Sequence, residues 1–116
     1  MELIALLSSG KGTWGQVAGL MTYGNWDKII ILGDDFSKSF IHEKKFEFIN
    51  INLSQRIREL RDEFSQKLKG KIDGTEVALS LASGDGKEHM ALISALITLP
   101  VGIRFAALTK EGIIDL

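Results

Sequence analysis

The chain has 116 residues, of which 45% are hydrophobic and 25% are charged, and its formal net charge is −1 at neutral pH. This balance is typical of a globular domain and excludes an intrinsically disordered chain. A charge so close to zero also excludes a general attraction to long nucleic acids, so any anion binding must be local.

Cysteine is absent, and histidine occurs only at His42 and His89. Disulfides, thiolate metal sites and cysteine nucleophiles are therefore excluded, and a histidine-based metal centre is not expected. The acidic Glu2 and the lack of a basic N-terminal region argue against a signal peptide. The longest apolar run, residues 90–103, is broken by polar residues and is too short to cross a bilayer. We expect a cytoplasmic protein with no metal, no cofactor and no contact with a membrane.

The first half of the chain alternates apolar runs with one helical segment. Residues 2–7 form a short apolar run, which is typical of a strand buried on both faces. Residues 13–24 carry apolar side chains at helical spacing, and Gly24 suits the end of a helix. A second buried strand is predicted at residues 28–33. A polar loop with room for a helical turn follows, and then residues 46–52 alternate as in a strand near the sheet edge.

The second half contains the strongest predicted helix, which Asn52 opens with Gln55 as its capping-box partner. Its apolar stripe comprises Leu53, Ile57, Leu60, Phe64 and Leu68, and its other face is nearly all charged. After a turn at residues 70–74, the pattern predicts a strand at 76–82, a helix at 87–99 and a strand at 102–108. Residues 113–116 are predicted to return as a short hairpin strand.

Strands that alternate with helices predict an α/β protein with a mostly parallel sheet. Right-handed crossovers favour a single Rossmann-like domain over residues 1–116, with a doubly wound sheet of five or six strands and helices on both faces. In such a sheet the first and fourth strands are neighbours, and the ligand crevice lies at their carboxyl ends.

A loop rich in glycine and hydroxyl residues follows each of these two strands. The first loop comprises Ser8, Ser9, Gly10, Lys11, Gly12 and Thr13, and the second comprises Ser83, Gly84, Asp85, Gly86 and Lys87. Each loop opens a helix, whose unsatisfied N–H groups and positive dipole end favour an anion. The two lysines would add full charges there. The two loops together therefore predict a phosphate-binding site.

Two alternatives remain for the first loop, whereas a Walker phosphate loop is excluded because both loops lack its first glycine. Gly10, Gly12 and Gly15 match the dinucleotide fingerprint G-x-G-x-x-G. Asp34 or Asp35 follows about twenty residues later, where a ribose-binding acid is expected. A NAD- or NADP-binding protein that uses the GKGTWG loop is therefore one alternative. A non-catalytic interaction subunit, with glycines that only form a tight turn, is the other.

Residues 76–108, EVALSLASGDGKEHMALISALITLPVGIRFAAL, resemble the best-marked segment of the CRISPR-associated Rossmann fold (CARF) family. In that family an apolar strand ends in a loop close to Thr-Gly-Gly-Thr-Lys, followed by an apolar helix and another strand. By position, Ser83 stands for the first threonine, Gly84 and Asp85 for the two glycines, Gly86 for the second threonine and Lys87 for the lysine. The family also has a ligand loop after its first strand, which corresponds here to residues 8–14.

The resemblance implies a homodimer whose joint cleft binds a cyclic oligoadenylate, a phosphate-rich cyclic oligonucleotide that serves as a second messenger. Some such domains also cleave the ring slowly without a metal, and the ribose 2′-OH is then the nucleophile. In such a ring nuclease Lys87 and Lys11 would stabilise charge on the phosphate. His89 is the candidate general acid or base near the site. Whether this chain is an enzyme stays open.

The helix at residues 87–99 is apolar around almost its whole circumference. Its apolar residues are Met90, Ala91, Leu92, Ile93, Ala95, Leu96 and Ile97. A helix of this kind is normally buried on all sides. In so small a domain we expect one face to lie on the sheet and the other to meet a second copy in a twofold homodimer.

Overall fold

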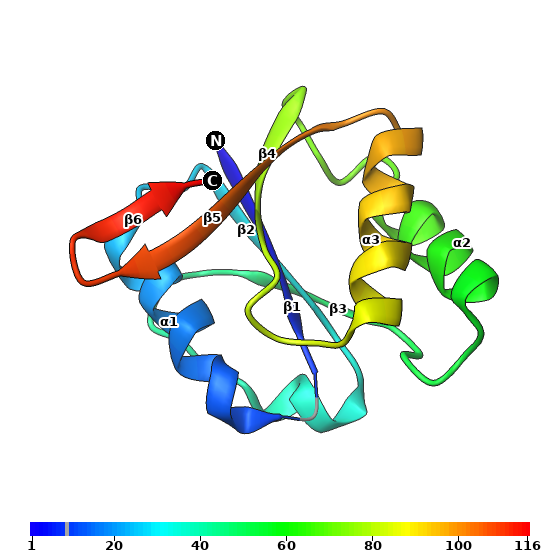
Figure 1. Cartoon of the computed structure of the whole chain (residues 1–116), viewed down its shortest axis with the longest axis horizontal. Coiled ribbons are helices and arrows are strands. Elements are labelled where there is room, and N and C mark those ends of the chain that lie inside the picture. The colour runs from blue at the N-terminus through cyan, green and yellow to red at the C-terminus, as the bar shows by residue number, and fades with distance from the viewer. Residues whose placement is uncertain (9) are drawn as a thin grey trace.

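A computed structural model describes residues 1–8 and 10–116, and Figure 1 shows the arrangement of their helices and strands. The strands are β1 (Glu2–Leu7), β2 (Lys28–Gly33), β3 (Glu47–Asn50), β4 (Glu76–Ser80), β5 (Gly102–Thr109) and β6 (Gly112–Asp115). The α-helices are α1 (Trp14–Tyr23), α2 (Ile57–Leu68) and α3 (Gly86–Thr98), and two short 3-10 helices are η1 (Lys11–Thr13) and η2 (Asp35–Ser39). Each predicted strand is confirmed, with ends that differ by up to two residues.

The strands form one sheet in the order β3-β2-β1-β4-β5-β6. The first five are parallel, and β6 returns antiparallel to β5 as the predicted hairpin strand. The chain thus starts in the middle of the sheet, builds outward to β3, and returns to add β4 on the other side of β1. The predicted pairing of the first and fourth strands is confirmed, with registers from Glu2↔Val77 to Ala5↔Ser80.

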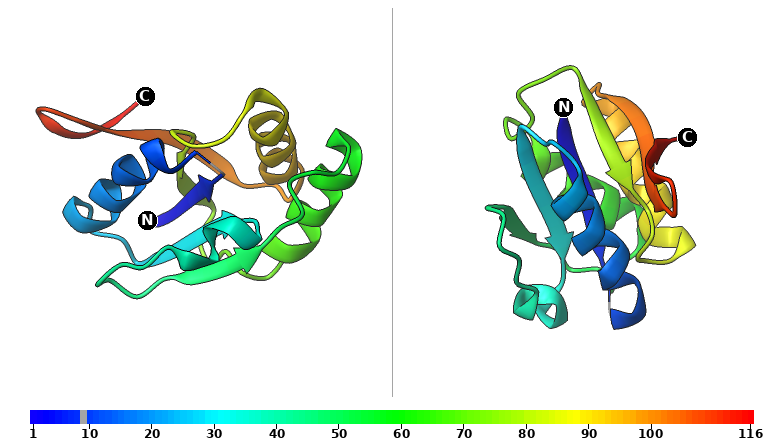
Figure 2. Two further views of the ribbon diagram at one scale, coloured as in Figure 1. Left: turned by 90° about the horizontal axis from the view of Figure 1, so that it is seen from below. Right: turned by 90° about the vertical axis from the view of Figure 1, so that its left-hand side faces the viewer.

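β1 is buried on both faces because successive side chains of a strand point to opposite sides of the sheet. Leu3, Ala5 and Leu7 pack with α1, whereas Ile4 and Leu6 pack with α2 and α3. Helices therefore cover both faces, with α1 on one side and α2 and α3 on the other (Figure 2). No helix within the described residues has the length and apolar character needed to cross a membrane.

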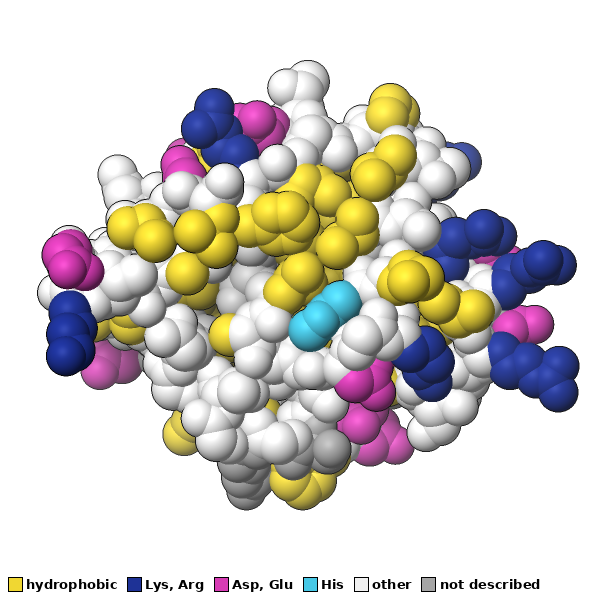
Figure 3. All heavy atoms as spheres, viewed as in Figure 1, with side chains coloured by type: hydrophobic (Ala, Val, Ile, Leu, Met, Phe, Trp, Pro, Cys, Tyr) yellow, Lys and Arg dark blue, Asp and Glu magenta, His cyan; other side chains and the backbone are white. Residues whose placement is uncertain are grey.

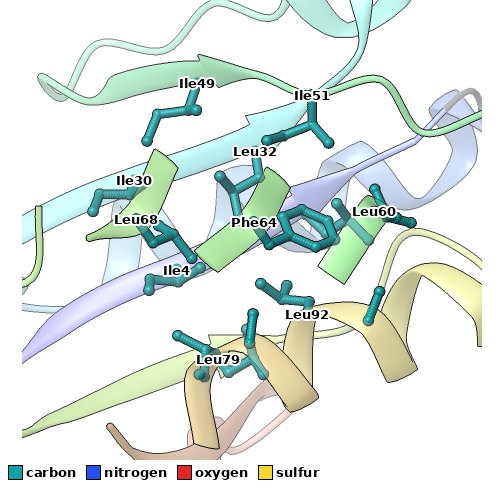
Figure 4. Close-up of a cluster of buried hydrophobic side chains, with 14 of the residues drawn as sticks. Ile4, Ile30, Leu32, Ile49, Ile51, Leu60, Phe64, Leu68, Leu79 and Leu92 are labelled. Carbon is teal, nitrogen blue, oxygen red and sulfur yellow. The ribbon is translucent and has the colours of Figure 1, made fainter. Parts of the chain in front are cut away.

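The larger core cluster lies between the sheet and the α2–α3 pair. Phe64 of α2 is fully buried there, next to Leu60 and Leu68 on the same face of the helix. Figure 4 shows its ring between strand residues such as Leu32 and the α3 residue Leu92. The predicted apolar stripe is therefore confirmed for Leu60, Phe64 and Leu68. It is wrong for Ile57, whose side chain is exposed at the first turn of the helix.

The predicted start of this helix is wrong, because α2 begins at Ile57 and not at Asn52. The Asn52 side chain accepts a hydrogen bond from the Ser54 N–H (3.1 Å), which forms a local turn instead of a helix cap. The Gln55 side chain donates to the Glu63 carboxylate, so the predicted capping box is absent. Leu53 is buried in the core from this turn rather than from the helix.

Glu2 is a buried carboxylate that holds the predicted turn before β4. It accepts hydrogen bonds from the backbone N–H groups of Asp73 (3.0 Å) and Gly74 (2.7 Å). A buried carboxylate needs such donors, since without them its desolvation would be unfavourable. The acidic second residue thus has a structural role, which sequence reasoning did not predict.

Candidate functional site

The two glycine-containing loops meet at the carboxyl ends of β1 and β4, in the lower half of Figure 1. The Ser8 N–H donates a hydrogen bond to the Ser83 hydroxyl oxygen over 2.9 Å. A hollow, called here the crevice, lies between the loops and is lined by Ser8, Gly10, Gly12, Thr13, Ala82, Ser83, Gly84 and Asp85. The predicted convergence of the loops is therefore confirmed. Ala82, which sequence reasoning missed, lines the crevice because it lies between the end of β4 and Ser83.

On one side of the crevice the N-terminus of α1 has no acidic cap. Thr13 is its N-cap residue, but the Thr13 side chain makes no capping bond and the first turn contains no acidic residue. The Thr13 hydroxyl instead donates to the Gly10 carbonyl (3.1 Å). Within the described residues, the first turn of α1 supplies no carboxylate to balance the positive end of the helix, which is therefore suited to an anion. The predicted ligand residue Ser9 and the side chain of Lys11 lie outside the described residues.

On the other side, two carboxylates cap the N-terminus of α3. Asp85 accepts a hydrogen bond from the Glu88 N–H (2.9 Å), and the Glu88 carboxylate accepts one from the Asp85 N–H (3.0 Å). This reciprocal pair is a capping box, and Gly86 is the first residue of the helix after it. The capping box satisfies the Asp85 and Glu88 N–H groups and puts two carboxylates at the positive end of α3, so this geometry does not support the expected anion site there. This side of the crevice carries negative charge.

Lys87 does not extend into the crevice, in contrast to our expectation of a charge beside it. Its ammonium group donates to the carbonyl oxygens of Leu53 (3.0 Å) and Gln55 (2.8 Å). These carbonyls belong to the turn that precedes α2, so Lys87 ties that turn to the start of α3. Lys87 lies at this turn and not beside the crevice because the turn offers two backbone carbonyl oxygens as acceptors for its ammonium group.

His89 lies beside the crevice, with Nε2 only 2.8 Å from the carbonyl oxygen of Ser83. A carbonyl oxygen only accepts hydrogen bonds, so Nε2 must carry the proton and donate it. That nitrogen is therefore not available as a general base. The predicted catalytic role of His89 has no support from this geometry, because the ring is engaged with the backbone of the loop.

The glycines of the two loops differ in whether another residue could replace them. Gly84 has φ +107°, and a Cβ atom there would lie 2.6 Å from Leu6 and 2.9 Å from the His89 ring, so only glycine fits. Gly10, Gly12 and Gly15 have no positive φ, and a Cβ atom at any of them would meet nothing within 4 Å. The close helix–strand packing that the dinucleotide fingerprint needs is therefore missing.

The carboxylates near the ends of β2 and β3 are engaged in local pairs. The hydrogen bond and positive charge of Lys38 lower the pKa of Asp35, and the two residues form an ion pair over 3.0 Å. Partial burial acts to raise the pKa of Glu63, but hydrogen bonds from Lys67, the Asn52 N–H and the Gln55 side chain outweigh it and lower that pKa. The Ser37 hydroxyl lies 3.3 Å from the Asp34 carboxylate but is closer to the Leu7 carbonyl (3.0 Å). The lowered pKa values of Asp35 and Glu63 are therefore explained by neighbouring protein groups, without a ligand.

Trp14 joins the first loop to the core. Its indole N–H donates to the Ser8 carbonyl (3.1 Å), and its ring packs edge-on against Phe36 and Phe40 at centroid distances of 5.9 and 5.8 Å. Such edge-to-face contacts are favourable arrangements for aromatic pairs. Trp14 therefore helps to fix the loop that forms one wall of the crevice.

No family model matches the chain, and no curated protein matches it either. The resemblance to the CARF family consequently stays a prediction. The geometry of the crevice is the main evidence on function.

Proposed function

We propose that the chain is a Rossmann-like domain that binds a phosphate-rich nucleotide in the crevice, as a CARF-type sensor of cyclic oligoadenylate. The observation that carries this proposal is the meeting of two loops at the carboxyl ends of the adjacent parallel strands β1 and β4. The reversal of strand order at this point is where open α/β sheets bind ligands. The uncapped end of α1 supplies the electrostatic preference for an anion.

The two walls of the crevice suit different parts of one ligand. The α1 wall, with Gly10, Gly12 and Thr13, favours a phosphate group. The opposite wall carries the Asp85 carboxylate, which accepts hydrogen bonds and repels anions. An uncharged ribose or adenine group suits this wall better than a second phosphate does. A nucleotide offers both kinds of group at short spacing, whereas inorganic phosphate offers only one.

The proposal concerns binding more than cleavage. His89 is the imidazole closest to the crevice among the described residues, and its Nε2 is committed to the Ser83 carbonyl. Lys87 is engaged with two carbonyls at the turn before α2. Both groups would have to leave these partners before they could take part in ring cleavage. We therefore expect cleavage of a bound cyclic nucleotide to be slower than the approach of binding to equilibrium.

We also propose that a second copy covers the apolar surface next to the crevice. Hydrophobic side chains gather over β5 and α3 in Figure 3, and the exposed ones include Met90, Ile97, Phe105 and Leu116. A hollow lined by Leu79, Leu81, Ala82, Phe105, Ala106, Ala107, Leu116 and Gln16 contains no charged side chain, so the surface is compatible with its own copy. Ala82 lines this hollow and also the crevice, so a second copy seated on the hollow would lie close to a ligand in the crevice.

The test of binding is a thermal-shift titration with cyclic tetra-adenylate and cyclic hexa-adenylate, followed by NAD, NADP and ATP. A ligand at a hundred times its dissociation constant adds about 2.7 kcal/mol to the free energy of unfolding. For a domain of this size that corresponds to a rise in melting temperature of about 10 °C. Stabilisation by NAD alone would contradict the sensor proposal and favour the dinucleotide alternative.

Gly12→Asp and Gly12→Asn form a matched pair that locates the ligand. Both side chains fit, because a Cβ atom at Gly12 meets nothing within 4 Å. The aspartate puts a negative charge at the N-terminus of α1, which is favourable for the helix but repels a phosphate. We expect Gly12→Asp to lose the nucleotide-induced stabilisation and Gly12→Asn to keep most of it. Equal binding by both variants would place the ligand elsewhere.

The dimer is tested by light scattering after size-exclusion chromatography. A variant with Met90→Glu and Ile97→Glu puts two charges on the outer face of α3, where both side chains are exposed. We expect it to be a monomer, whereas wild type and the control Ile57→Glu, which alters an exposed residue of α2, should be dimers. A wild-type monomer at all concentrations would refute this part of the proposal.

A further inference from the structure

Three hydrogen bonds connect the start of α1 to the start of α3 along the crevice. The Trp14 indole N–H donates to the Ser8 carbonyl (3.1 Å), and the Ser8 N–H donates to the Ser83 hydroxyl (2.9 Å). The His89 ring N–H then donates to the Ser83 carbonyl (2.8 Å). We call Trp14, Ser8, Ser83 and His89 the crevice network. Its Ser8–Ser83 bond joins residues that are 75 positions apart in the chain.

Ser83 is the centre of this network and is almost completely buried, with 1% of its surface exposed. Its hydroxyl oxygen accepts from one loop and its carbonyl oxygen accepts from α3. A hydroxyl group in this position is poorly placed to contact a ligand in the open hollow. The hydrogen bonds of Ser83 join the two walls of the crevice. They explain why this serine is buried here, without the ligand contact that the resemblance to the CARF family implies.

His89 holds the same loop by a second kind of contact. Its Nε2 atom lies 2.9 Å from the place where a Cβ atom of Gly84 would stand, so the ring packs directly against the loop backbone. Leu6 packs against the same point from β1. The loop conformation at Gly84, with φ +107°, is thus enclosed by groups from α3 and β1.

We propose that Ser83 and His89 are positioning residues, which act through the crevice network to hold the two walls at the separation that a ligand requires. They would hold the walls without touching the ligand. The consequence for affinity rests on the proposed function, but the network itself does not. A preorganised site loses less freedom on binding, so breaking the network should weaken affinity even where the binding groups are intact.

The structural half of the proposal is tested on the ligand-free protein by ¹⁵N NMR and amide hydrogen exchange. In Ser83→Ala the Ser8 N–H loses its acceptor, and we expect it to exchange about tenfold faster. The Trp14 indole resonance should shift as the Ser8 carbonyl moves. The Trp26 indole N–H, which donates to the Leu20 carbonyl (2.7 Å), is the internal reference and should not move. Unchanged Ser8 and Trp14 signals would overturn the network.

The functional half uses calorimetric titration with cyclic tetra-adenylate and a matched pair at His89. Glutamine retains an N–H donor that can reach the Ser83 carbonyl, whereas leucine has a similar size and no donor. We expect affinity to fall about fivefold in Ser83→Ala and His89→Leu and to return towards wild type in His89→Gln. Equal affinity in all variants, despite altered NMR signals, would overturn the positioning role. If wild type binds nothing while the NMR signals move, the proposed function fails and the network stands.

Discussion

Asp85 has two roles that a pair of substitutions can separate. Its carboxylate caps α3 through the Glu88 N–H at 2.9 Å, and it also puts a negative charge on one wall of the crevice. Asp85→Asn keeps a side-chain oxygen for the cap and removes the charge. Asp85→Ala removes both. We predict that these two variants have similar affinities for an anionic nucleotide but different stabilities.

The magnitudes come from the two interactions separately. Loss of an N-cap to alanine costs about 1 kcal/mol, whereas asparagine is as good a cap as aspartate. A phosphate at about 6 Å from the carboxylate, with an effective dielectric constant of about 40, is repelled by about 1.4 kcal/mol. Removing the charge should therefore raise the affinity about tenfold. The gain should shrink as salt is added, because screening weakens the repulsion.

The measurements are urea unfolding for stability and calorimetric titration with cyclic tetra-adenylate for affinity. We expect Asp85→Asn to unfold within about 0.5 kcal/mol of wild type and Asp85→Ala to be about 1 kcal/mol less stable. Both should bind the nucleotide more tightly than wild type at low salt. Weaker binding by Asp85→Asn would refute the reasoning. It would mean that the ligand donates a hydrogen bond to the carboxylate, and that this bond stabilises the complex by more than the repulsion between the carboxylate and the phosphate destabilises it.

Three further predictions concern the fold. Gly84→Ala should destabilise by more than about 1 kcal/mol because of its positive φ, whereas Gly15→Ala, in an open helical position, should stabilise by about 0.5 kcal/mol in the same urea assay. Phe64→Ala should cost about 3–5 kcal/mol and the half-exposed Ile57→Ala less than about 1 kcal/mol, and equal losses would contradict the observed face of α2. The lowered pKa of Glu63 means that its contribution to stability is present above the ordinary value of 4.5 and is lost as pH falls through the lower folded value. Glu63→Gln should therefore lose less stability than wild type between neutral pH and about pH 3, as measured by melting temperature.

The sheet could be predicted because its signal is local. β1 is apolar at every position after Glu2, and a strand covered on both faces needs such a run. The pairing of β1 with β4 followed from general rules on crossovers rather than from any residue in those strands. The role of Glu2 could not be predicted, because its partners at Asp73 and Gly74 are distant in the chain and are donors that every residue type except proline possesses.

Within the site, the meeting of the loops could be predicted from topology, but the charge of each wall could not. Asp85 precedes Glu88 by three residues, which is a capping-box spacing that could have indicated the cap. The resemblance to a family with an uncharged glycine at this position favoured phosphate binding instead. By contrast, nothing local indicates that the His89 ring donates to the Ser83 carbonyl, since that bond depends on how the loop bends at Gly84.

The misplaced start of α2 and the unexpected position of Lys87 have one cause. If the helix had begun at Asn52, the carbonyls of Leu53 and Gln55 would accept hydrogen bonds from N–H groups four residues later within the helix. Because α2 begins at Ile57, both carbonyls lack these helical partners, and the Lys87 ammonium group satisfies them at 3.0 and 2.8 Å. A lysine held by two carbonyls keeps its charge close to α3 but directed away from the crevice. Lys87 could therefore reach a phosphate only if its hydrogen bonds to the Leu53 and Gln55 carbonyls were broken. Any contribution of this lysine to ligand binding thus depends on a rearrangement of the turn before α2.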